Sequence, residues 1–282
     1  MKVEITPVRV VQAVAALFLN GQEEKPLSIN DIARDLLIQE GAYDPALDKR
    51  LLLAALRLIH RRPWPFKISP VICFVGKGGA NKSTATTQFA VIAAKKGLRV
   101  LVLDSDRQRS VSTWSAARGN DPSITVRACE YNRIEAACRE GKKAGFNLIL
   151  VDHPQQPGEA WPALVRSVDQ FVLLARPALF DLKTAQQWIR HLEAHKAPYL
   201  AVISSAPPRR EMIDNPAVRD ARSSLQALTS RLWPGQITAR QPIVTATASG
   251  RGIIEFEPAG PASVEYMVLW HRVLQTMKRG MS

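Results

Sequence analysis

The sequence contains few cysteines and no long apolar run. Its 3 cysteines, Cys73, Cys129 and Cys138, form no Cys-x-x-Cys pair, so we expect reduced, structural thiols rather than a disulfide framework or a thiolate metal site. No apolar stretch reaches the roughly 18 residues needed to span a bilayer. The first residues also lack the basic flank, apolar segment and cleavage site of a signal peptide. These absences favour a cytoplasmic protein.

Acidic residues are also scarce. The chain carries 38 Lys and Arg against 25 Asp and Glu, a formal net charge of +13. Residues 1–68 hold 10 basic and 8 acidic side chains, a net of +2, which leaves 28 against 17, or +11, for residues 69–282. A protein this basic attracts polyanions, with nucleic acid ahead of anionic membranes. We therefore expect nonspecific DNA as a partner and a nucleoid-associated location.

The first 65 residues predict a small all-helical domain. Helical patterns with capping or proline start signals begin at Thr6, Ser28 and Asp44, and the prolines of Arg62-Pro63-Trp64-Pro65 end the third helix. The basic residues of this unit suit a helix-turn-helix that reads DNA. Its second connection, however, is longer than the usual 3 to 4 residues, and its third helix is strongly apolar. A packing or dimerisation role therefore remains open.

Short apolar runs alternate with helical stretches in residues 70–282. Such runs are typical of buried parallel strands. The alternation predicts an α/β domain with a doubly wound, mostly parallel sheet. The apolar runs are residues 71–75, 100–103, 148–151, 171–175 and 200–204, and the helical stretches are 82–96, 133–143, 182–195 and 216–231.

A glycine-rich loop, Gly76 to Thr84, follows the first apolar run and opens a helix, which is the context that a phosphate-binding loop requires. Glycines let backbone N–H groups approach phosphate closely, and the helix N-terminus adds partial positive charge. Lys82 is placed to reach the β- and γ-phosphates, and the Ser83 hydroxyl is placed to hold Mg²⁺. The loop therefore predicts a site for a nucleoside triphosphate with Mg²⁺.

The loop resembles the deviant Walker A motif of the ParA and MinD family of P-loop ATPases, through Lys77-Gly78-Gly79-x-x-Lys82-Ser83. Other landmarks of the family recur in the same order. They are the strand ending in Asp104-Ser-Asp106-Arg-Gln108, the Walker B strand ending at Asp152, the strand and helix of residues 168–185, and Ile253-Ile254-Glu255. The resemblance covers about residues 70–280 and is greatest to ParA-type partition proteins.

The resemblance implies a role for each matching residue. Lys77 would contact the nucleotide of the partner subunit in an ATP-sandwich homodimer, whereas Lys82 serves its own subunit. Asp106 would position the attacking water, so these three are the expected catalytic residues. Asp104 would support the metal shell and Asp152 would hold Mg²⁺ through water, although Asp104 and Asp106 have the alternative role of helix caps. The loop residues expected to contact ATP are Lys77, Gly78, Gly79, Ala80, Asn81, Lys82, Ser83 and Thr84.

Three positions depart from the family pattern. Asn81 stands where the family has Gly; if that position needs a positive φ, Asn is the least costly substitute, but its side chain crowds the phosphates. Arg107 replaces a proline, and His153 follows the Walker B aspartate. We expect His153 to be a hydrogen-bonded neighbour rather than a catalyst. These departures predict that nucleotide binding survives and that hydrolysis is slow.

The last predicted helix, from about residue 262 to 277, somewhat resembles a MinD-like membrane anchor. Glu265 interrupts its apolar character and basic residues are few, so we expect it to dock on the sheet without stable membrane association. The side chains predicted near one face are Val264, Met267, Val268, His271 and Leu274.

The resemblance implies a partition ATPase for plasmid or other DNA segregation. ATP would drive dimerisation, the dimer would bind DNA nonspecifically, and a centromere-binding partner protein encoded nearby would stimulate hydrolysis. The candidate DNA contacts, for which solvated helix faces are the alternative, are Arg219, Arg222, Arg240 and Arg251. The alternatives are an ATP-gated scaffold or regulator with weak hydrolysis, acting in conjugation or autoregulation, and a MinD-like membrane positioning ATPase.

Overall fold

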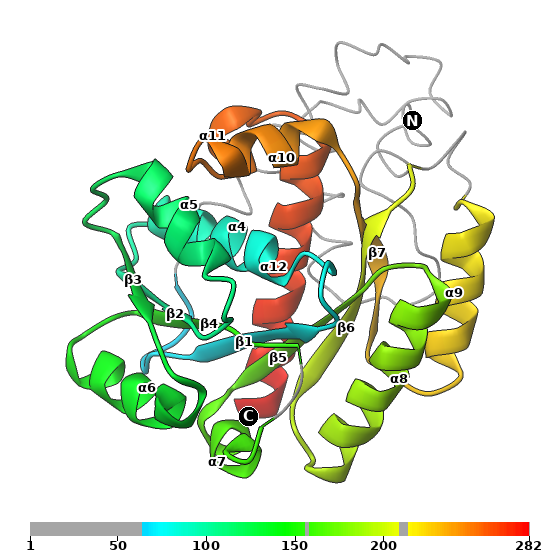
Figure 1. Ribbon diagram of the computed structural model, residues 1–282, viewed down its shortest axis with the longest axis horizontal. Helices are drawn as coiled ribbons and strands as arrows, with labels where there is room; N and C mark the ends of the chain where they lie inside the picture. Colours follow the sequence, from blue (N-terminus) through cyan, green and yellow to red (C-terminus); the bar gives the residue numbers. More distant parts are fainter. Residues whose placement is uncertain (1–63, 156–157, 209–213, 282) are drawn as a thin grey trace, which may run out of the picture. The chain divides into compact units, whose positions relative to one another are not determined.

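The structure is a computed structural model that describes residues 64–155, 158–208 and 214–281. From Pro65 onward the described residues belong to one compact unit (Figure 1). The predicted amino-terminal helical domain, residues 1–65, lies outside the described residues except for its last two positions. Its boundary and its role therefore stay predictions.

The centre of the unit is a sheet of 7 strands in the order β3-β2-β4-β1-β5-β6-β7, with every adjacent pair parallel. This confirms the predicted doubly wound α/β fold. β1, β2, β4 and β5 are buried along their whole length, as expected for continuous apolar runs in a sheet covered on both faces. The strands are β1 (Val71–Gly76), β2 (Val100–Asp104), β3 (Ile124–Ala128), β4 (Leu148–Asp152), β5 (Gln170–Ala175), β6 (Tyr199–Ala206) and β7 (Leu232–Thr238).

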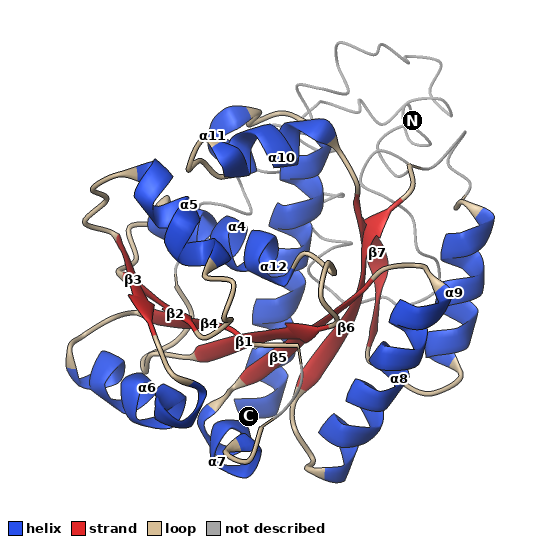
Figure 2. Cartoon of the chain, in the orientation of Figure 1, coloured by secondary structure: helices blue, strands red, loops and turns tan. Residues whose placement is uncertain are grey.

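Helices cover both faces of this sheet (Figure 2). α4, α5, α10, α11 and α12 lie on one face, and α6, α7, α8 and α9 lie on the other. The first group is α4 (Lys82–Ala94), α5 (Ser110–Arg118), α10 (Gln241–Ala248), α11 (Ile253–Phe256) and α12 (Pro261–Met281). The second group is α6 (Ile134–Lys143), α7 (Trp161–Ser167), α8 (Leu179–Ala194) and α9 (Pro216–Gln226), with a short 3-10 turn, Tyr131–Arg133, before α6.

The carboxy-terminal helix α12 packs against β7, β5 and α4, so it docks on the sheet as expected. The predicted face needs correction. Tyr266, Trp270, Val273 and Met277 form the centre of the buried face, because they follow the helical repeat of 3 to 4 residues. The predicted face lies slightly to one side of it, since Met267 and Leu274 are buried but Val264, Val268 and His271 are only half-buried.

None of the helices among the described residues combines the length with the apolar character that crossing a bilayer requires.

Candidate functional site

The turn between β1 and α4 has a backbone that glycine alone fits well. Gly76 has a φ of 140°, and a Cβ at this position would lie 2.3 Å from the Leu174 carbonyl oxygen. Gly79 also has a positive φ, of 79°. α4 begins at Lys82, directly after the turn. The loop therefore presents bare backbone at a helix N-terminus, which is the arrangement that binds phosphate.

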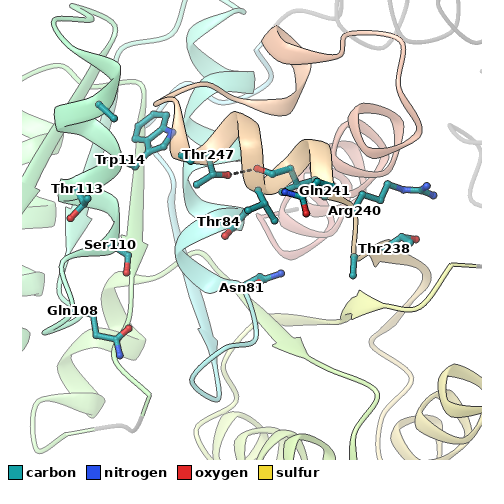
Figure 3. A pocket seen from close by; sticks show the side chains of 15 residues that line it. Asn81, Thr84, Gln108, Ser110, Thr113, Trp114, Thr238, Arg240, Gln241 and Thr247 are labelled. Atoms are coloured by element: carbon teal, nitrogen blue, oxygen red, sulfur yellow. Dashed lines mark hydrogen bonds between the residues drawn. The ribbon is translucent and has the colours of Figure 1, made fainter.

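Asn81 is the N-cap residue of α4, with φ 64° and ψ 32°. This left-handed conformation explains why Asn can replace the glycine of the family, since Asn tolerates it better than other side chains do. The amide Nδ2 donates to Oγ of Ser205, 2.7 Å away on β6, and points away from Gln108 and Ser110 in Figure 3. The hydrogen bond anchors the amide to β6 rather than leaving it free to crowd the phosphates.

Replacing Asn81 by Ala is expected to lower the free energy of unfolding by about 1–3 kcal/mol. Ala loses the hydrogen bond to Ser205 and adopts the left-handed conformation at a cost of roughly 1–2 kcal/mol. The matched control is Asn81→Gly, which loses the same hydrogen bond without strain and should cost about 1 kcal/mol or less. Urea unfolding measures both, and equal losses would show that the backbone conformation at this position does not matter.

Three of the predicted site residues meet at the start of α4. The Lys82 side chain is 5% exposed, and its Nζ lies 3.3 Å from the Lys77 carbonyl oxygen. Oγ of Ser83 donates to Oδ2 of Asp152 at 2.6 Å. Asp152 ends β4, next to β1 and β2 in the sheet. The structure thus brings the predicted phosphate lysine, the metal-binding hydroxyl and the Walker B carboxylate together.

Burial governs the charge of this group. It raises the pKa of Asp152 to about 7, although the hydrogen bond from Ser83 and the charge of Lys82 act in the opposite direction. It also lowers the pKa of Lys82, against the attraction of Asp152 and Asp106. Each charged form lacks the hydration that it would have in water. Both would therefore be stabilised by a ligand that brings phosphate to Lys82 and a cation to Asp152.

The two aspartates after β2 lie in different surroundings. Oδ2 of Asp104 accepts hydrogen bonds from the N–H of Ser112 at 2.8 Å and from its Oγ at 2.6 Å, so this carboxylate supports the first turn of α5. Its Oδ1 is buried without a hydrogen-bond partner. Asp106 is half-buried, lines a cavity with the loop, and accepts from the N–H of Gln108 at 3.0 Å. Asp106 is thus accessible from the cavity, whereas Asp104 serves α5.

Lys77 is held against the start of α8. Its Nζ lies 3.4 Å from Oδ2 of Asp181, with the lysine side chain 35% exposed and the aspartate 3% exposed. Asp181 also accepts from Nε and NH2 of Arg176 at 2.8 and 3.2 Å. The Lys77 ammonium lies 5.8 Å from the centroid of the Phe180 ring. In a single subunit, therefore, the lysine that the resemblance assigns to the partner's nucleotide is paired with a carboxylate of its own chain.

His153 is buried behind Asp152. Its Nδ1 lies 2.6 Å from the Pro154 carbonyl oxygen, and its ring makes edge contacts with Tyr131, Trp161 and Trp188 at centroid distances of 5.2, 5.7 and 5.5 Å. Burial lowers the pKa of His153 to about 4, so the imidazole is neutral near pH 7. This environment fits a packed, hydrogen-bonded neighbour.

A cavity of about 300 Å³ lies over the loop and is lined by Gly78, Lys82, Ser83 and Asp106 among others. A larger cavity of about 710 Å³ lies between α5 and α10 (Figure 3). The two share a wall made of Asn81, Thr84, Gln108, Ser110, Trp114 and Thr247. Together they form a groove of the size in which proteins bind nucleotide-sized ligands.

The four arginines predicted to contact DNA do not share one environment. Arg219 is exposed on α9. Arg222 pairs with Asp214 at 3.4 Å and donates to the carbonyl oxygen of Trp233 at 3.3 Å. Arg240 pairs with Glu265 at 3.2 Å and lines the larger cavity. Arg251 is exposed, but its Cζ lies 5.4 Å from the Phe256 ring centroid and its NH2 donates to the Glu255 carbonyl oxygen. Arg222, Arg240 and Arg251 therefore have structural partners that the sequence did not indicate.

Arg118 and Glu255 connect α5 to α11. NH1 and NH2 of Arg118 donate to Glu255 at 2.8 and 3.0 Å, and Nζ of Lys95 lies 3.1 Å from the same carboxylate. Burial favours a higher pKa for Glu255, but the hydrogen bonds from Arg118, Lys95 and the N–H of Gly252 outweigh it and lower the pKa to about 2. The network fixes α5, which forms one wall of the larger cavity.

Glu255→Gln is expected to lower the free energy of unfolding at pH 7 by about 1–3 kcal/mol, since hydrogen bonds to a charged group are lost. The pKa of Glu255 is lower in the folded protein than its usual 4.5. Its charged form therefore stabilises the fold fully above the unfolded-state pKa, and this stabilisation is lost as the pH falls toward the folded-state pKa. Urea unfolding should therefore show the difference shrinking from about pH 5 to pH 3. Glu140→Gln, in an exposed pair with Arg133, is the control and should cost less than about 1 kcal/mol. A deficit independent of pH would contradict this assignment.

The residues present fit a magnesium nucleotide. Oδ1 of Asp152 is buried without a hydrogen-bond partner, and Ser83 adds a hydroxyl, so the available ligands are the oxygens that Mg²⁺ prefers. Within the described part of the chain, no cluster of three or more His, Cys, Asp or Glu side chains could hold a metal by itself.

Comparisons with known proteins identify the family and the fold. A family model described as the CobQ/CobB/MinD/ParA nucleotide binding domain matches residues 71–237. The protein virC1 of Rhizobium rhizogenes is 28% identical over 121 residues, which are 41% of this chain and 52% of that protein. The match thus spans about half the length of this curated relative.

Solved structures share the fold at low sequence identity. MinD from Pyrococcus horikoshii OT3, complexed with Mg-ADP, superposes with a TM-score of 0.58 at 15% identity, covering 73% of this chain and 96% of MinD. An ATP complex of McdA from Cyanothece gives 0.58 at 12% identity, with coverages of 74% and 98%. A ParA family ATPase from Chlorobium tepidum TLS gives 0.54 at 15% identity, with coverages of 73% and 99%. Since the family model matches more than half of the 282 residues, the chain belongs to the CobQ/CobB/MinD/ParA nucleotide-binding family.

Proposed function

We propose that this protein is an ATP-dependent, dimerising partition-type ATPase that binds DNA nonspecifically in its ATP state. The observation that carries the proposal is that Lys82, Ser83 and Asp106 line one cavity over the loop, with the buried Asp152 hydrogen-bonded to Ser83. A phosphate cradle, a metal-holding pair and an accessible carboxylate are the parts that phosphoryl transfer to water requires.

Each residue would have a separate task. Lys82 and the loop backbone would bind the β- and γ-phosphates, and Ser83 and Asp152 would hold Mg²⁺, the latter through water. When bound, Mg²⁺ supplies positive charge to the phosphates. Asp106, which faces the cavity, would orient the attacking water. The larger cavity between α5 and α10 would take the nucleoside.

Dimerisation would depend on Lys77. Its ion pair with Asp181 is 3.4 Å long and the lysine is 35% exposed. Asp181 is only 3% exposed, but it keeps its hydrogen bonds from Arg176, so moving Lys77 to a phosphate of the partner's ATP leaves no buried charge unpaired. Such an exchange would make assembly of two subunits depend on ATP.

Segregation of DNA is the proposed task. The net charge of +11 in residues 69–282 and the likeness to a ParA family ATPase support it. In this proposal the dimer coats DNA in the cell, and hydrolysis stimulated by a centromere-binding partner protein releases it. Static light scattering of the purified protein tests the first step: we expect a dimer with ATP and Mg²⁺ and a monomer with ADP. A monomer in both states would overturn the dimerising switch.

An ATP-gated scaffold or regulator, in conjugation or autoregulation, is the second candidate. Arg107, exposed beside Asp106 in place of the family's proline, favours it because a long charged side chain there changes the surroundings of the attacking water. Turnover separates the two proposals. Partition predicts slow ATP hydrolysis that DNA or the partner accelerates, whereas a scaffold predicts binding and dimerisation with no acceleration.

A membrane positioning ATPase is less compatible with the structure. α12 buries Tyr266, Trp270 and Val273 against the rest of the unit, so the apolar face that would enter a bilayer is already in use. Flotation with anionic vesicles, with and without ATP, would detect such an activity directly.

A further inference from the structure

A group of basic side chains surrounds Phe146 at the edge of the sheet formed by β3. Cζ of Arg99 lies 5.1 Å from the centroid of the Phe146 ring, and Cζ of Arg127 lies 5.9 Å from it. Both arginines are exposed, whereas the ring between them is 6% exposed. NH1 of Arg99 also contacts the carbonyl oxygens of Ala144 and Gly145 at 3.4 Å, next to the exposed Lys143 that ends α6.

Acidic side chains pair with the cations next to Arg99, Arg127 and Lys143, but among the described residues they do not pair with these three. On α6, Arg133 lies 3.7 Å from Glu140 and Arg139 lies 3.1 Å from Glu135. Lys142 lies 4.0 Å from Asp169. Among the described residues, by contrast, no carboxylate forms an ion pair with Arg99, Arg127 or Lys143. The three charges therefore remain available to an external anion.

The aromatic ring restricts the two guanidinium groups before any ligand binds. Stacking on Phe146 holds them on one surface, so less side-chain entropy is lost when they contact an anion. Planar guanidinium groups are also the side chains best suited to bind phosphate oxygens in pairs. Because the ring is covered, the surface that the group presents is polar, which suits a nucleic acid backbone better than insertion into lipid.

The group lies at the opposite edge of the sheet from Arg219 and Arg222 on α9. β3 and β7 are the two opposite edge strands, and α6 and β3 lie at one side of the molecule with α9 and β7 at the other (Figure 1). Arg99 and Phe146 precede β2 and β4, so they lie at the amino ends of those strands. Arg127 lies near the carboxyl end of β3, but β2 and β4 separate β3 from β1, whose carboxyl end the nucleotide loop follows. The group can therefore contact a large ligand without obstructing the nucleotide cavity.

We propose that Arg99, Arg127 and Lys143 form a surface that contacts the phosphates of duplex DNA. The proposal rests on the proposed function and names the part of the protein that performs its DNA binding. Since the surface is remote from the loop, ATP would act through dimerisation, which joins two such surfaces on one duplex and raises the apparent affinity.

The experiment compares two doubly substituted full-length proteins that lose the same charge. The test variant is Arg127→Gln with Lys143→Gln, which leaves Arg99 and its contacts with α6 in place. The control is Arg133→Gln with Arg139→Gln, whose arginines on or beside α6 already have acidic partners. Fluorescence anisotropy with two unrelated duplexes, in ATP and at several salt concentrations, gives the affinity and its salt dependence. Light scattering and basal ATP turnover check that both variants still form the ATP-dependent dimer and still hydrolyse ATP.

We expect the test variant to bind both duplexes at least about tenfold more weakly at roughly 0.1 M salt, with a log–log salt slope flatter by about 4 in the dimer, since each lost phosphate contact removes roughly 0.9. The control should stay within about threefold of the wild type. If the wild type binds DNA and the test variant binds equally well, the surface lies elsewhere and the proposed function stands. If the wild type binds no DNA in ATP, the proposed surface and the DNA binding of the proposed function are both wrong. Loss of binding to anionic vesicles with DNA binding unchanged would assign the group to lipid and overturn the proposal.

Discussion

Lys82→Ala is expected to abolish ATP binding at concentrations that saturate the wild type. The side chain is buried at the start of α4, and removing one partner of a buried charge pair costs about 2–5 kcal/mol, or roughly 30- to 5,000-fold in affinity. No other cation is positioned among the described residues that line the cavity over the loop. Isothermal titration with a slowly hydrolysed ATP analogue would measure the loss.

Lys77→Ala is the matched control, because it removes the same functional group from the same loop. Lys77 is paired with Asp181 outside the cavity lining, so the monomer should bind the analogue within a few-fold of the wild type. The ATP-dependent dimer should be lost. Equal loss of nucleotide affinity in both variants would contradict the distinct role proposed for Lys77.

Asp106→Ala is expected to trap an ATP-bound dimer. The substitution removes the carboxylate proposed to orient water, at a cost of about 10²–10⁴-fold in turnover, and leaves Lys82, Ser83 and Asp152 in place. Gel filtration with light scattering would show a dimer that persists for long after ATP is added, while the wild-type dimer decays as ATP is consumed.

Asp106→Asn serves as its control, since the amide oxygen can still accept the hydrogen bond from Gln108. It should trap the dimer as well, because it lacks the charge and basicity of the carboxylate. If Asp106→Ala stays monomeric with ATP and Mg²⁺ while Asp106→Asn behaves like the wild type, the carboxylate has a structural role in the loop after β2.

The buried strands of the fold could be predicted because their sequences are continuous apolar runs. All 5 predicted runs, which became β1, β2, β4, β5 and β6, are strands of the structure. The two edge strands were missed for physical reasons. β3 alternates between apolar and polar residues and is buried only at its first position. β7 contains Pro234 and Gly235, which usually signal a turn but are tolerated at a sheet edge.

Helix limits were predicted less well where a strand followed closely. The stretch 216–231 was expected to be helical, but α9 ends at Gln226 and β7 begins at Leu232. α5 was not predicted, because its start carries no local capping signal: the N-cap residue is Arg109, with a φ of 51°. The first turn of α5 is supported instead by Asp104, eight residues before Ser112.

The candidate site was predictable where the motif is local and unpredictable where its partners are distant. The loop from Gly76 to Thr84 follows from short-range sequence, whereas the positive φ of Asn81 was only a condition attached to the family's glycine. The contacts of Asn81 with Ser205 and of Lys77 with Asp181 join residues 124 and 104 positions apart, and only the folded sheet brings them together. The same holds for the pairing of Arg240 with Glu265.

The measurement that tests the central claim most directly is a titration of the wild-type protein with duplex DNA of arbitrary sequence, in ATP and in ADP, at several salt concentrations. An ATP-gated dimer that carries its DNA contacts on both subunits predicts tighter binding in ATP and a slope of log affinity against log salt that is about twice as steep as in ADP. Equal affinity and equal slope in the two nucleotides would contradict the account.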